Sequence, residues 1–297
     1  MHIAISGSHG FIGSAVMETL WGAGHQVTPI VRGESAVEMG IAWSAETGYV
    51  DAAKLEGIEA VVHLAGESIQ GRWTPEKKAL ILESRRKGTR ALSEALAGLA
   101  KPPQVLVCAS AIGYYGDRGD ELLREESESG GGFLAGVVRE WEAATEPAAQ
   151  KGIRVVNLRF GVVLGADGGA LAQMLLPFKM GVGGRVGSGK QYMSWVALDD
   201  VVGAIGHALA TESLRGPVNV VSPNPARNAE FTKALGKVLS RPTIFPLPAF
   251  VVKLAFGQMG EELLLGSQRV EPVKLAASGY KFHYAELEGA LRRALNT

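Results

Sequence analysis

The chain has 297 residues, and its 30 lysines and arginines balance its 30 aspartates and glutamates. This length can bury a large core, and the neutral balance excludes the strong electrostatic attraction typical of nucleic-acid and acidic-membrane binders. Cys108 is the single cysteine, which excludes an internal disulfide, and its apolar neighbours predict a buried structural thiol. No apolar run approaches ~20 residues, and the chain opens on a strand rather than a signal peptide. We therefore expect a soluble, cytosolic protein.

The N-terminal segment combines a short strand, a glycine-rich loop and an amphipathic helix. Ile3 to Ser6 predicts the strand, and Phe11 to Ala23 predicts the helix. Between them the spacing G-x-x-G-x-x-G is formed by Gly7, Gly10 and Gly13, while Ser8 replaces the second glycine of the commoner G-x-G-x-x-G pattern. Glycines permit a tight turn and a close backbone approach, so a pyrophosphate can rest on the helix N-terminus. The strand before and the helix after favour a dinucleotide site.

A second predicted strand, Gln26 to Val31, ends in Arg32. An acidic residue at this strand end would bind the ribose 2′-hydroxyl of NAD(H), whereas an arginine can pair with the 2′-phosphate of NADP(H). Arg32 therefore predicts NADP(H) as the cofactor. The alternative is a solvated arginine beside Glu34.

Strands and helices alternate over the first 160 residues. Predicted strands at 60–64, 104–109 and 154–158 alternate with predicted helices at 76–99 and 133–150. This βαβ alternation with nearly continuous apolar strands predicts an α/β fold with a doubly wound parallel sheet. Ligands of such sheets bind at the carboxyl ends of the strands, which places Ser6, Arg32, Leu64 to Gly66, Ser110 and Arg159 to Gly161 around one crevice.

The pattern changes near residue 165. We expect residues 1–164, with a returning strand at 218–221, to form a dinucleotide-binding domain of the Rossmann type. Residues 165–217 and 222–297 are expected to form a smaller substrate lobe. Gly184 to Lys190 matches the G-x-x-x-x-G-K of a phosphate-binding P-loop, but Gln191 follows and a strand rather than a helix comes next, which argues against that motif.

Several motifs together resemble the extended short-chain dehydrogenase/reductase superfamily, and within it an epimerase-like branch of NADP-dependent oxidoreductases that ends in a segment of unknown function, here 246–294. The resemblance runs from end to end. It rests on the glycine loop, His63-Leu64-Ala65-Gly66-Glu67, Arg72-Trp73, Ser84-Arg85, Tyr115-Gly116 after Ser110, Arg159 to Gly165, Gly187-Ser188-Gly189 before Gln191-Tyr192, and Trp195 to Val201.

The resemblance implies a set of cofactor contacts. Gly7, Gly10, Phe11, Ile12 and Gly13 would hold the pyrophosphate, and Arg32 the 2′-phosphate. The adenosine ribose would lie along Leu64, Ala65 and Gly66, the helix residue Arg85 would contact the cofactor, and Val162 would follow the strand near the nicotinamide. For Arg85, an ordinary surface arginine beside Arg86 is the alternative.

The catalytic pattern of the superfamily is incomplete. Typical members use a serine or threonine, then a tyrosine that transfers a proton, then a lysine four residues later. Ser110 is in place, but Phe133 and Val137 stand where the tyrosine and lysine are expected, and neither side chain can carry a proton.

Three hypotheses follow. In the first, another group acts as acid or base: Tyr114 or Glu67, with Arg139 as the nearest predicted cation, while Tyr115 is expected to serve packing. In the second, the protein binds NADP(H) without turnover, as a redox sensor or regulator. In the third, it reduces an activated substrate whose carbonyl accepts a hydrogen bond from Ser110.

The remaining predictions concern partners. A small-molecule substrate of carbonyl or sugar-nucleotide type is expected to contact Glu67, Arg185, Lys190, Gln191 and Trp195, although a solvated loop explains the two cations equally well. Asp199 and Asp200 are expected to cap a helix. No metal site, nucleic-acid partner or membrane contact is predicted. A homodimer could form through helices 76–99 and 133–150, whose apolar positions core packing explains equally well.

Overall fold

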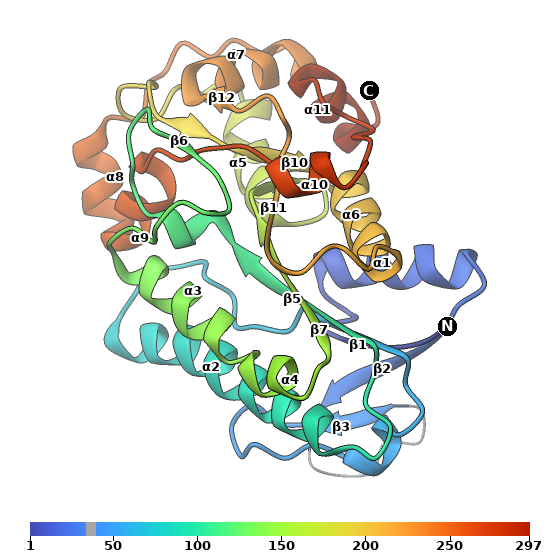
Figure 1. The fold of residues 1–297 in the computed structure, drawn as a ribbon. Coiled ribbons are helices and arrows are strands. Elements are labelled where there is room, and N and C mark those ends of the chain that lie inside the picture. Colours follow the sequence, from blue (N-terminus) through green and yellow to red (C-terminus); the bar gives the residue numbers. More distant parts are fainter. Residues whose placement is uncertain (34–39) are drawn as a thin grey trace.

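A parallel sheet of seven strands forms the centre of the protein, in the order β11-β7-β5-β4-β1-β2-β3. The computed structural model describes residues 1–33 and 40–297 (Figure 1). All six pairings in the sheet are parallel, which confirms the predicted fold class. The strands are β1 (His2–Ser6), β2 (Gln26–Arg32), β3 (Ile41–Trp43), β4 (Ala60–His63), β5 (Val105–Ala111), β7 (Arg154–Phe160) and β11 (Gly216–Val220).

Helices cover both faces of this sheet (Figure 1). One face carries α2 (Pro75–Gly98), α3 (Phe133–Ala143) and α4 (Glu146–Gln150), and the other carries α1 (Phe11–Gly22) and α6 (Leu198–Ala210). Side chains alternate across a strand, so in β1 the fully buried Ile3 and Ile5 join the core beneath α1, while Ala4 joins the core beneath α2. Burial on both faces explains why these strands read as continuous apolar runs.

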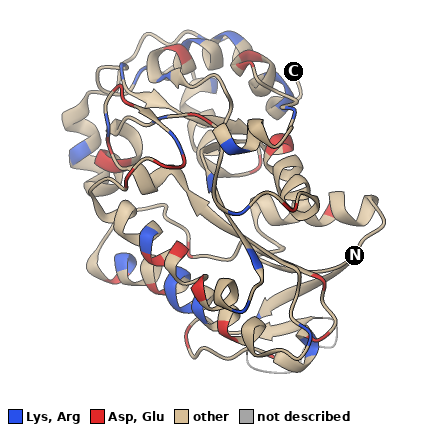
Figure 2. Cartoon of the chain, in the orientation of Figure 1, with Lys and Arg blue, Asp and Glu red and all other residues tan. Residues whose placement is uncertain are grey.

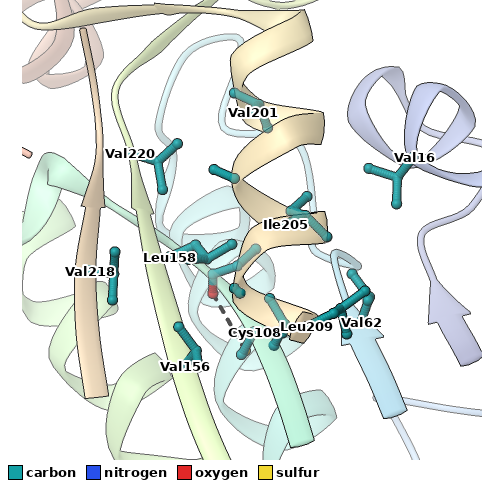
Figure 3. Packing of buried hydrophobic residues seen from close by; sticks show 14 of the residues in the cluster. Val16, Val62, Cys108, Val156, Leu158, Val201, Ile205, Leu209, Val218 and Val220 are labelled. Carbon is teal, nitrogen blue, oxygen red and sulfur yellow. Dashed lines mark hydrogen bonds between the residues drawn. The ribbon is translucent and has the colours of Figure 1, made fainter. Parts of the chain in front are cut away.

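Helix α6 belongs with the sheet. Figure 3 shows its residues Val201, Ile205 and Leu209 beside the strands, and they share one buried cluster with Leu158 of β7 and Val218 of β11. The expected boundary, which assigns all of 165–217 to the smaller lobe, is therefore wrong for this helix. A hydrophobic stripe on a helix does not reveal which apolar surface it will cover.

Cys108 lies in the same cluster and is fully buried. Burial raises the pKa of its thiol well above the ordinary value. This agrees with the predicted structural role, because a buried neutral thiol is a poor nucleophile.

The predicted helix 133–150 is two helices. α3 ends at Ala143, and α4 begins at Glu146, with Pro147 in its first turn. Proline has no amide hydrogen to continue the helical bonding. The hydroxyl of Thr145 instead donates to the carbonyl of Glu142, at 2.7 Å.

The smaller lobe covers the carboxyl ends of the strands and has its own core around Trp195, Phe231 and Leu291. Its C-terminal segment is tied to α6 through the fully buried Asp200, which accepts the backbone amides of His283 (2.7 Å) and Tyr284 (3.0 Å). The remaining elements are η1 (Ala52–Leu55), η2 (Ile112–Tyr115), β6 (Leu122–Leu123), β8 (Val162–Leu164), α5 (Gly169–Lys179), β9 (Tyr192–Met193), β10 (Trp195–Ala197), β12 (Ala226–Arg227), α7 (Asn228–Leu239), α8 (Ala249–Phe256), α9 (Gln258–Gly260), η3 (Glu261–Leu265), β13 (Arg269–Val270), α10 (Val273–Ala277) and α11 (Leu287–Leu295).

The aspartates at the start of α6 do not cap it. Asp199 pairs with Arg293 at 2.8 Å, and Asp200 holds the C-terminal segment. The expectation of a helix cap is therefore wrong, although both carboxylates lie in the first turn, where the helix dipole favours negative charge.

Charged residues of both signs gather along α2 (Figure 2). Its exposed side chains form pairs within the helix, including Arg86–Glu83 at 2.8 Å and Arg90–Glu94 at 2.6 Å. Its apolar residues Leu92 and Leu96 face the core. Core packing thus accounts for Leu92 and Leu96, whereas Leu80 is exposed, and the homodimer stays a prediction. Within residues 1–33 and 40–297, no helix is both long enough and apolar enough to cross a membrane.

Candidate functional site

The glycine loop between β1 and α1 is shaped by close backbone contacts. Gly7 has φ +70°, and a Cβ atom there would lie 2.9 Å from the amide nitrogen of Ala65. A Cβ atom on Gly13 would lie only 2.1 Å from the carbonyl oxygen of Gly7. The same oxygen accepts a hydrogen bond from the amide of Gly10 at 3.0 Å. A side chain at Gly7 or Gly13 would therefore open the loop or push it off the 64–65 segment.

The N-terminus of α1 offers free backbone donors. The first helical bond runs from the amide of Ser14 to the carbonyl of Gly10 at 2.9 Å, and no side chain caps this end among the described residues. The preceding amides of Phe11, Ile12 and Gly13 are therefore left for a ligand. Together with the helix dipole, they form a cradle suited to a pyrophosphate.

The ring of Phe11 has a separate role. A Cβ atom on Gly165 or Gly168 would lie 2.5 Å from atoms of this ring, so the glycines make room for it. The ring thus anchors the start of α1 to the segment after β8, while the Phe11 backbone faces the cradle.

A buried polar group supports the floor of the cradle. The hydroxyl of Ser6 accepts the amides of Leu64 (3.2 Å) and Ala65 (3.3 Å) and bonds to Nδ1 of His63 at 2.6 Å. Nε2 of His63 reaches the hydroxyl of Thr89 at 3.1 Å. Burial lowers the pKa of His63 to about 4, so the imidazole is neutral at pH 7. Sequence reasoning missed this role, because Ser6 and His63 lie on different strands.

Arg85 lies against the turn after β4. Its Nη1 donates to the carbonyl of Glu67 at 2.9 Å, and its guanidinium covers the face of Gly66 and the ring of Trp141. Burial lowers its pKa to about 10. The alternative of an ordinary surface arginine is therefore wrong, and Arg85 is placed beside the predicted ribose site.

Arg32 ends β2 with an exposed side chain that makes no hydrogen bond or ion pair to any described residue. Glu34, its predicted competitor, lies outside the described residues. Glu67 pairs with Lys77 at 2.7 Å. Its carboxylate is thus occupied, and its pKa is lowered first by the hydrogen bond from Lys77 and further by the charges of Arg32 and Arg85. The structure therefore favours an ionised, ion-paired Glu67, and its role as a substrate contact or acid stays a prediction.

Ser110 is also occupied. Its hydroxyl donates to Oε1 of Glu142 at 2.6 Å, and the same carboxylate receives Nε and Nη2 of Arg159 at 2.7 and 2.8 Å. The Arg159 side chain is only 2% exposed. Glu142 therefore competes as a charged acceptor for the Ser110 hydroxyl, and the hydrogen bond from Ser110 to a substrate carbonyl stays a prediction. Glu142 was not recognised from the sequence, since it lies 32 residues from Ser110.

The two tyrosines after β5 differ sharply. Tyr115 is fully buried, donates to Asn219 at 2.8 Å and accepts Nη1 of Arg159 at 2.9 Å. Burial raises its pKa to about 12, which agrees with the predicted packing role. Tyr114 is half-buried, its ring lies 3.5 Å from the guanidinium carbon of Arg159, and its hydroxyl has no hydrogen bond within the described part of the chain.

The cation beside Tyr114 is therefore Arg159. The predicted candidate, Arg139, has no contact with the Tyr114 ring among the described residues and instead donates to Ser129 at 2.7 Å and to the carbonyl of Gly130 at 3.2 Å. Sequence distance misled here, since β7 brings Arg159 under the loop that carries Tyr114.

Phe133 and Val137, at the positions expected for the tyrosine and lysine, lie in an apolar cluster with Trp73 and Met259. The rings of Phe133 and Trp73 are 5.1 Å apart, edge to face. Glu262 of η3 accepts the backbone amides of Phe133 and Leu134, each at 2.9 Å. The C-terminal segment therefore supplies the cap that the N-terminus of α3, beginning after Gly132, lacks locally.

The predicted substrate contacts fall into two groups. Trp195 is fully buried in the core of the smaller lobe and donates to the carbonyl of Asn224 at 3.0 Å. Gln191 is buried, and its amide donates to the carbonyls of Val186 and Leu264. Both predictions are wrong, because these side chains hold the lobe together. Arg185 and Lys190 are exposed and stay predictions.

Val162 begins β8, with a half-buried side chain, and pairs with Trp195 of β10. It lies just beyond the carboxyl end of β7. Its contact with the nicotinamide stays a prediction.

The comparisons with known proteins agree with this arrangement. The sequence profile described as "NAD dependent epimerase/dehydratase family" matches residues 3–221, which include all of the sheet except His2, together with the glycine loop. The chain belongs to this family. A second profile, "Domain of unknown function (DUF1731)", matches residues 247–294. The resemblance and the predicted C-terminal segment are thereby confirmed.

Relatives in this family share nearly the full length of the chain. Epimerase family protein Mb2239 of Mycobacterium bovis is 44% identical over 97% of this chain and 96% of its own. Epimerase family protein SDR39U1 of Homo sapiens is 36% identical over 98% of this chain and 99% of its own. The Arabidopsis thaliana homologue, 39% identical over 98% of this chain and 86% of its own, is described as chloroplastic. A cytosolic location therefore stays a prediction for this chain.

Solved structures of proteins with related folds match nearly the full length of the chain. The crystal structure of human SDR39U1 (isoform 2) with NADPH matches with a TM-score of 0.91 and 35% identity, covering 100% of both chains. UDP-glucose 4-epimerase from Thermus thermophilus, in complex with NAD, matches with a TM-score of 0.75 and 21% identity over 98% of this chain and 97% of its own. The latter similarity establishes the fold alone.

Proposed function

We propose that this protein binds NADP(H) and reduces a small carbonyl compound, with a proton donor other than the usual tyrosine of the superfamily. The observation that carries the proposal is the glycine cradle at the uncapped N-terminus of α1. A side chain at position 7 or 13 would collide with the backbone of the loop or of the 64–65 segment, so this cradle requires glycine at both positions. The relative SDR39U1 of known structure contains NADPH, which supports the same cofactor here.

The residues around the cradle fit this cofactor. The amides of Phe11, Ile12 and Gly13 would bind the pyrophosphate. Arg32, exposed at the end of β2, would bind the 2′-phosphate. Arg85 and the Leu64 to Gly66 segment would hold the adenosine ribose. When bound, NADPH supplies a hydride.

Tyr114 is the proposed proton donor. The hydroxyls of Ser110 and Tyr115 and the carboxylate of Glu67 all bond within the protein. Tyr114 keeps a free hydroxyl within the described residues, and Arg159 holds its ring in place. Its phenol would donate a proton to the carbonyl oxygen of the substrate.

A fluorescence titration with NADPH and NADH tests the cofactor. Tighter binding of NADPH supports the proposal, and equal affinity for the two would remove the role of Arg32. Protein loaded with NADPH is then mixed with a panel of carbonyl compounds and sugar nucleotides. Oxidation that is lost in Tyr114→Phe and kept in Tyr49→Phe, an exposed tyrosine outside the site, supports the proton donor.

A second candidate is a non-catalytic NADP(H)-binding regulator. It is favoured by the internal engagement of Ser110, Tyr115 and Glu67 and by the apolar Phe133 and Val137. Tight NADPH binding without oxidation by any compound of the panel would support this candidate over the enzyme.

A further inference from the structure

Helix α8 is apolar on nearly every side, yet little of it is covered. Its sequence, Ala249 to Phe256, has seven apolar residues and one charged residue, Lys253. Only Val252 is buried, whereas Phe250 and Leu254 are 71% and 77% exposed. A helix that is hydrophobic all round ordinarily lies against other apolar surface. Figure 1 shows α8 at the outer edge of the molecule, away from the central sheet.

The segments on both sides of α8 extend this surface. Residues 244–263 hold six of the 14 large apolar side chains that are exposed among residues 1–33 and 40–297. We call these six side chains the α8 face: Ile244, Phe245, Phe250, Leu254, Phe256 and Leu263. Phe250 and Leu254 are four residues apart, so they lie on the same side of the helix. Leu263 belongs to η3, which is joined to α8 by the ion pair of Lys253 and Glu261 at 3.1 Å.

We propose that the α8 face binds the same face of a second copy of this chain, which gives a homodimer with a two-fold axis. In such a dimer the same apolar surface meets itself, and no other protein is needed. Phe250 and Leu254 lie at the contact between the two α8 helices. The dimer does not depend on bound NADP(H), and its contact differs from the helices that the sequence suggested, now α2, α3 and α4.

The area of the α8 face suits a dimer. Aromatic side chains bury about 150–250 Å² each, so these six side chains, 37–77% exposed, present on the order of 600 Å². Two copies would together bury about 1,200 Å², which is the lower end of the range for stable interfaces. The largest apolar patch of a typical monomer is about 300–600 Å². The α8 face is therefore large enough to favour association.

The charges around α8 favour a second copy over a membrane. Lys253, the one charged residue of the helix, pairs with Glu261 of the same chain, and the rest of α8 is uncharged (Figure 2). Two such faces therefore meet without unpaired like charges. Helices that lie on membrane surfaces carry a polar face rich in lysine and arginine, whereas α8 has a single lysine that is already paired.

The first test is the mass of the 297-residue chain in solution, measured by sedimentation velocity over a series of protein concentrations. We expect the wild type to be a dimer. In Phe250→Glu/Leu254→Glu the dissociation constant should rise at least ~100-fold, because two central apolar contacts become like charges. Trp21→Glu is the matched control and should stay dimeric, since Trp21 is 55% exposed on α1. Circular dichroism verifies that each variant is folded. A monomeric wild type would overturn the proposal.

Leu80→Glu separates the α8 face from α2, on which Leu80 is 58% exposed. The variant should remain a dimer. If it is monomeric while the α8 double variant stays dimeric, the contact lies on α2 and the proposal is wrong.

Cross-linking reports the contact directly. Cys108 is the single cysteine of the chain and is fully buried, so a cysteine introduced on the surface is the thiol open to a bismaleimide. We expect Leu254→Cys to form a covalent dimer in high yield and Trp21→Cys to form little. Equal yields from the two variants would contradict a contact through α8.

Flotation with vesicles of phosphatidylcholine and phosphatidylserine tests the other occupant of the face. The wild type should stay out of the vesicle fraction. A chain that is monomeric, floats with the vesicles and no longer does so in Phe250→Glu/Leu254→Glu would overturn the dimer and assign the α8 face to a membrane surface.

Discussion

The carboxylate of Glu262 binds the backbone amide of Phe133 at 2.9 Å, and through it the C-terminal segment reaches the start of α3. Gln258 continues this hydrogen-bond network to α2. Its side-chain amide donates to Glu262 at 2.7 Å and accepts a hydrogen bond from the ammonium of Lys78. The Lys78 ammonium also lies 5.4 Å from the centre of the Phe133 ring. The position expected for the catalytic tyrosine is thus a junction between the two parts of the protein.

Glu262→Ala should destabilise the protein by about 1–2 kcal/mol, because the first amides of α3 lose the acceptor that caps them. The free energy of unfolding is measured by urea denaturation. Glu261→Ala is the control, since Glu261 pairs with Lys253 on the surface and such pairs contribute little. Equal effects of the two substitutions would show that the cap is unimportant.

Glu142→Leu should be far more harmful, by about 3–5 kcal/mol, because it leaves the buried Arg159 guanidinium without its partner. The double variant Glu142→Leu/Arg159→Leu should lose less than the sum of the single variants. Unfolding in urea reports all three values. An additive result would mean that the two residues do not act as a pair.

His63 should make stability depend on pH. Its pKa is about 4 in the folded protein, lowered by burial, against 6.5 when unfolded. Only the unfolded state therefore takes up the proton as the pH falls from 6.5 to 4, and about 3 kcal/mol of stability is lost across that window.

The measurement compares the free energy of unfolding of the wild type and His63→Gln between pH 7.5 and about 4. The variant should be less stable at pH 7, because Ser6 and Thr89 lose their partner, yet its stability should fall less steeply on acidification. Parallel pH profiles would contradict the assignment.

Gly13→Ala should weaken NADPH binding and destabilise the protein by about 1–3 kcal/mol, because the added Cβ overlaps the carbonyl of Gly7. Gly22→Ala is the matched control on the same helix, as nothing lies within 4 Å of its Cβ position. The control should bind NADPH normally and be unchanged or more stable by up to ~1 kcal/mol. Normal binding by Gly13→Ala would refute the cradle.

The cradle could be predicted because its determinants are local. The G-x-x-G-x-x-G spacing places Gly7, Gly10 and Gly13 in one turn between a strand and a helix, and backbone sterics alone then restrict the conformation. The position of Arg32 at the end of β2 could be predicted for a similar reason, since the apolar run that marks the strand stops there.

The substrate side could not be predicted in this way. Trp195 and Gln191 were predicted to contact the substrate. In the structure, their side-chain N–H groups instead donate to backbone carbonyls of segments far along the chain. Ser110 was expected to face a substrate, but Glu142 and Arg159 meet it from two other elements.

The sequence by itself determined the parallel sheet, the glycine cradle, the arginine at the end of β2 and the absence of the tyrosine and lysine at Phe133 and Val137. Strand periodicity, glycine geometry and the identity of a side chain all act over a few residues. Only the tertiary structure decided which polar groups are already paired: Glu67 with Lys77, Ser110 with Glu142, and Glu262 with the start of α3. Hydrogen bonds and ion pairs depend on distances of about 3 Å, and for Ser110 and Glu262 the folded chain alone brings together partners that lie far apart in the sequence.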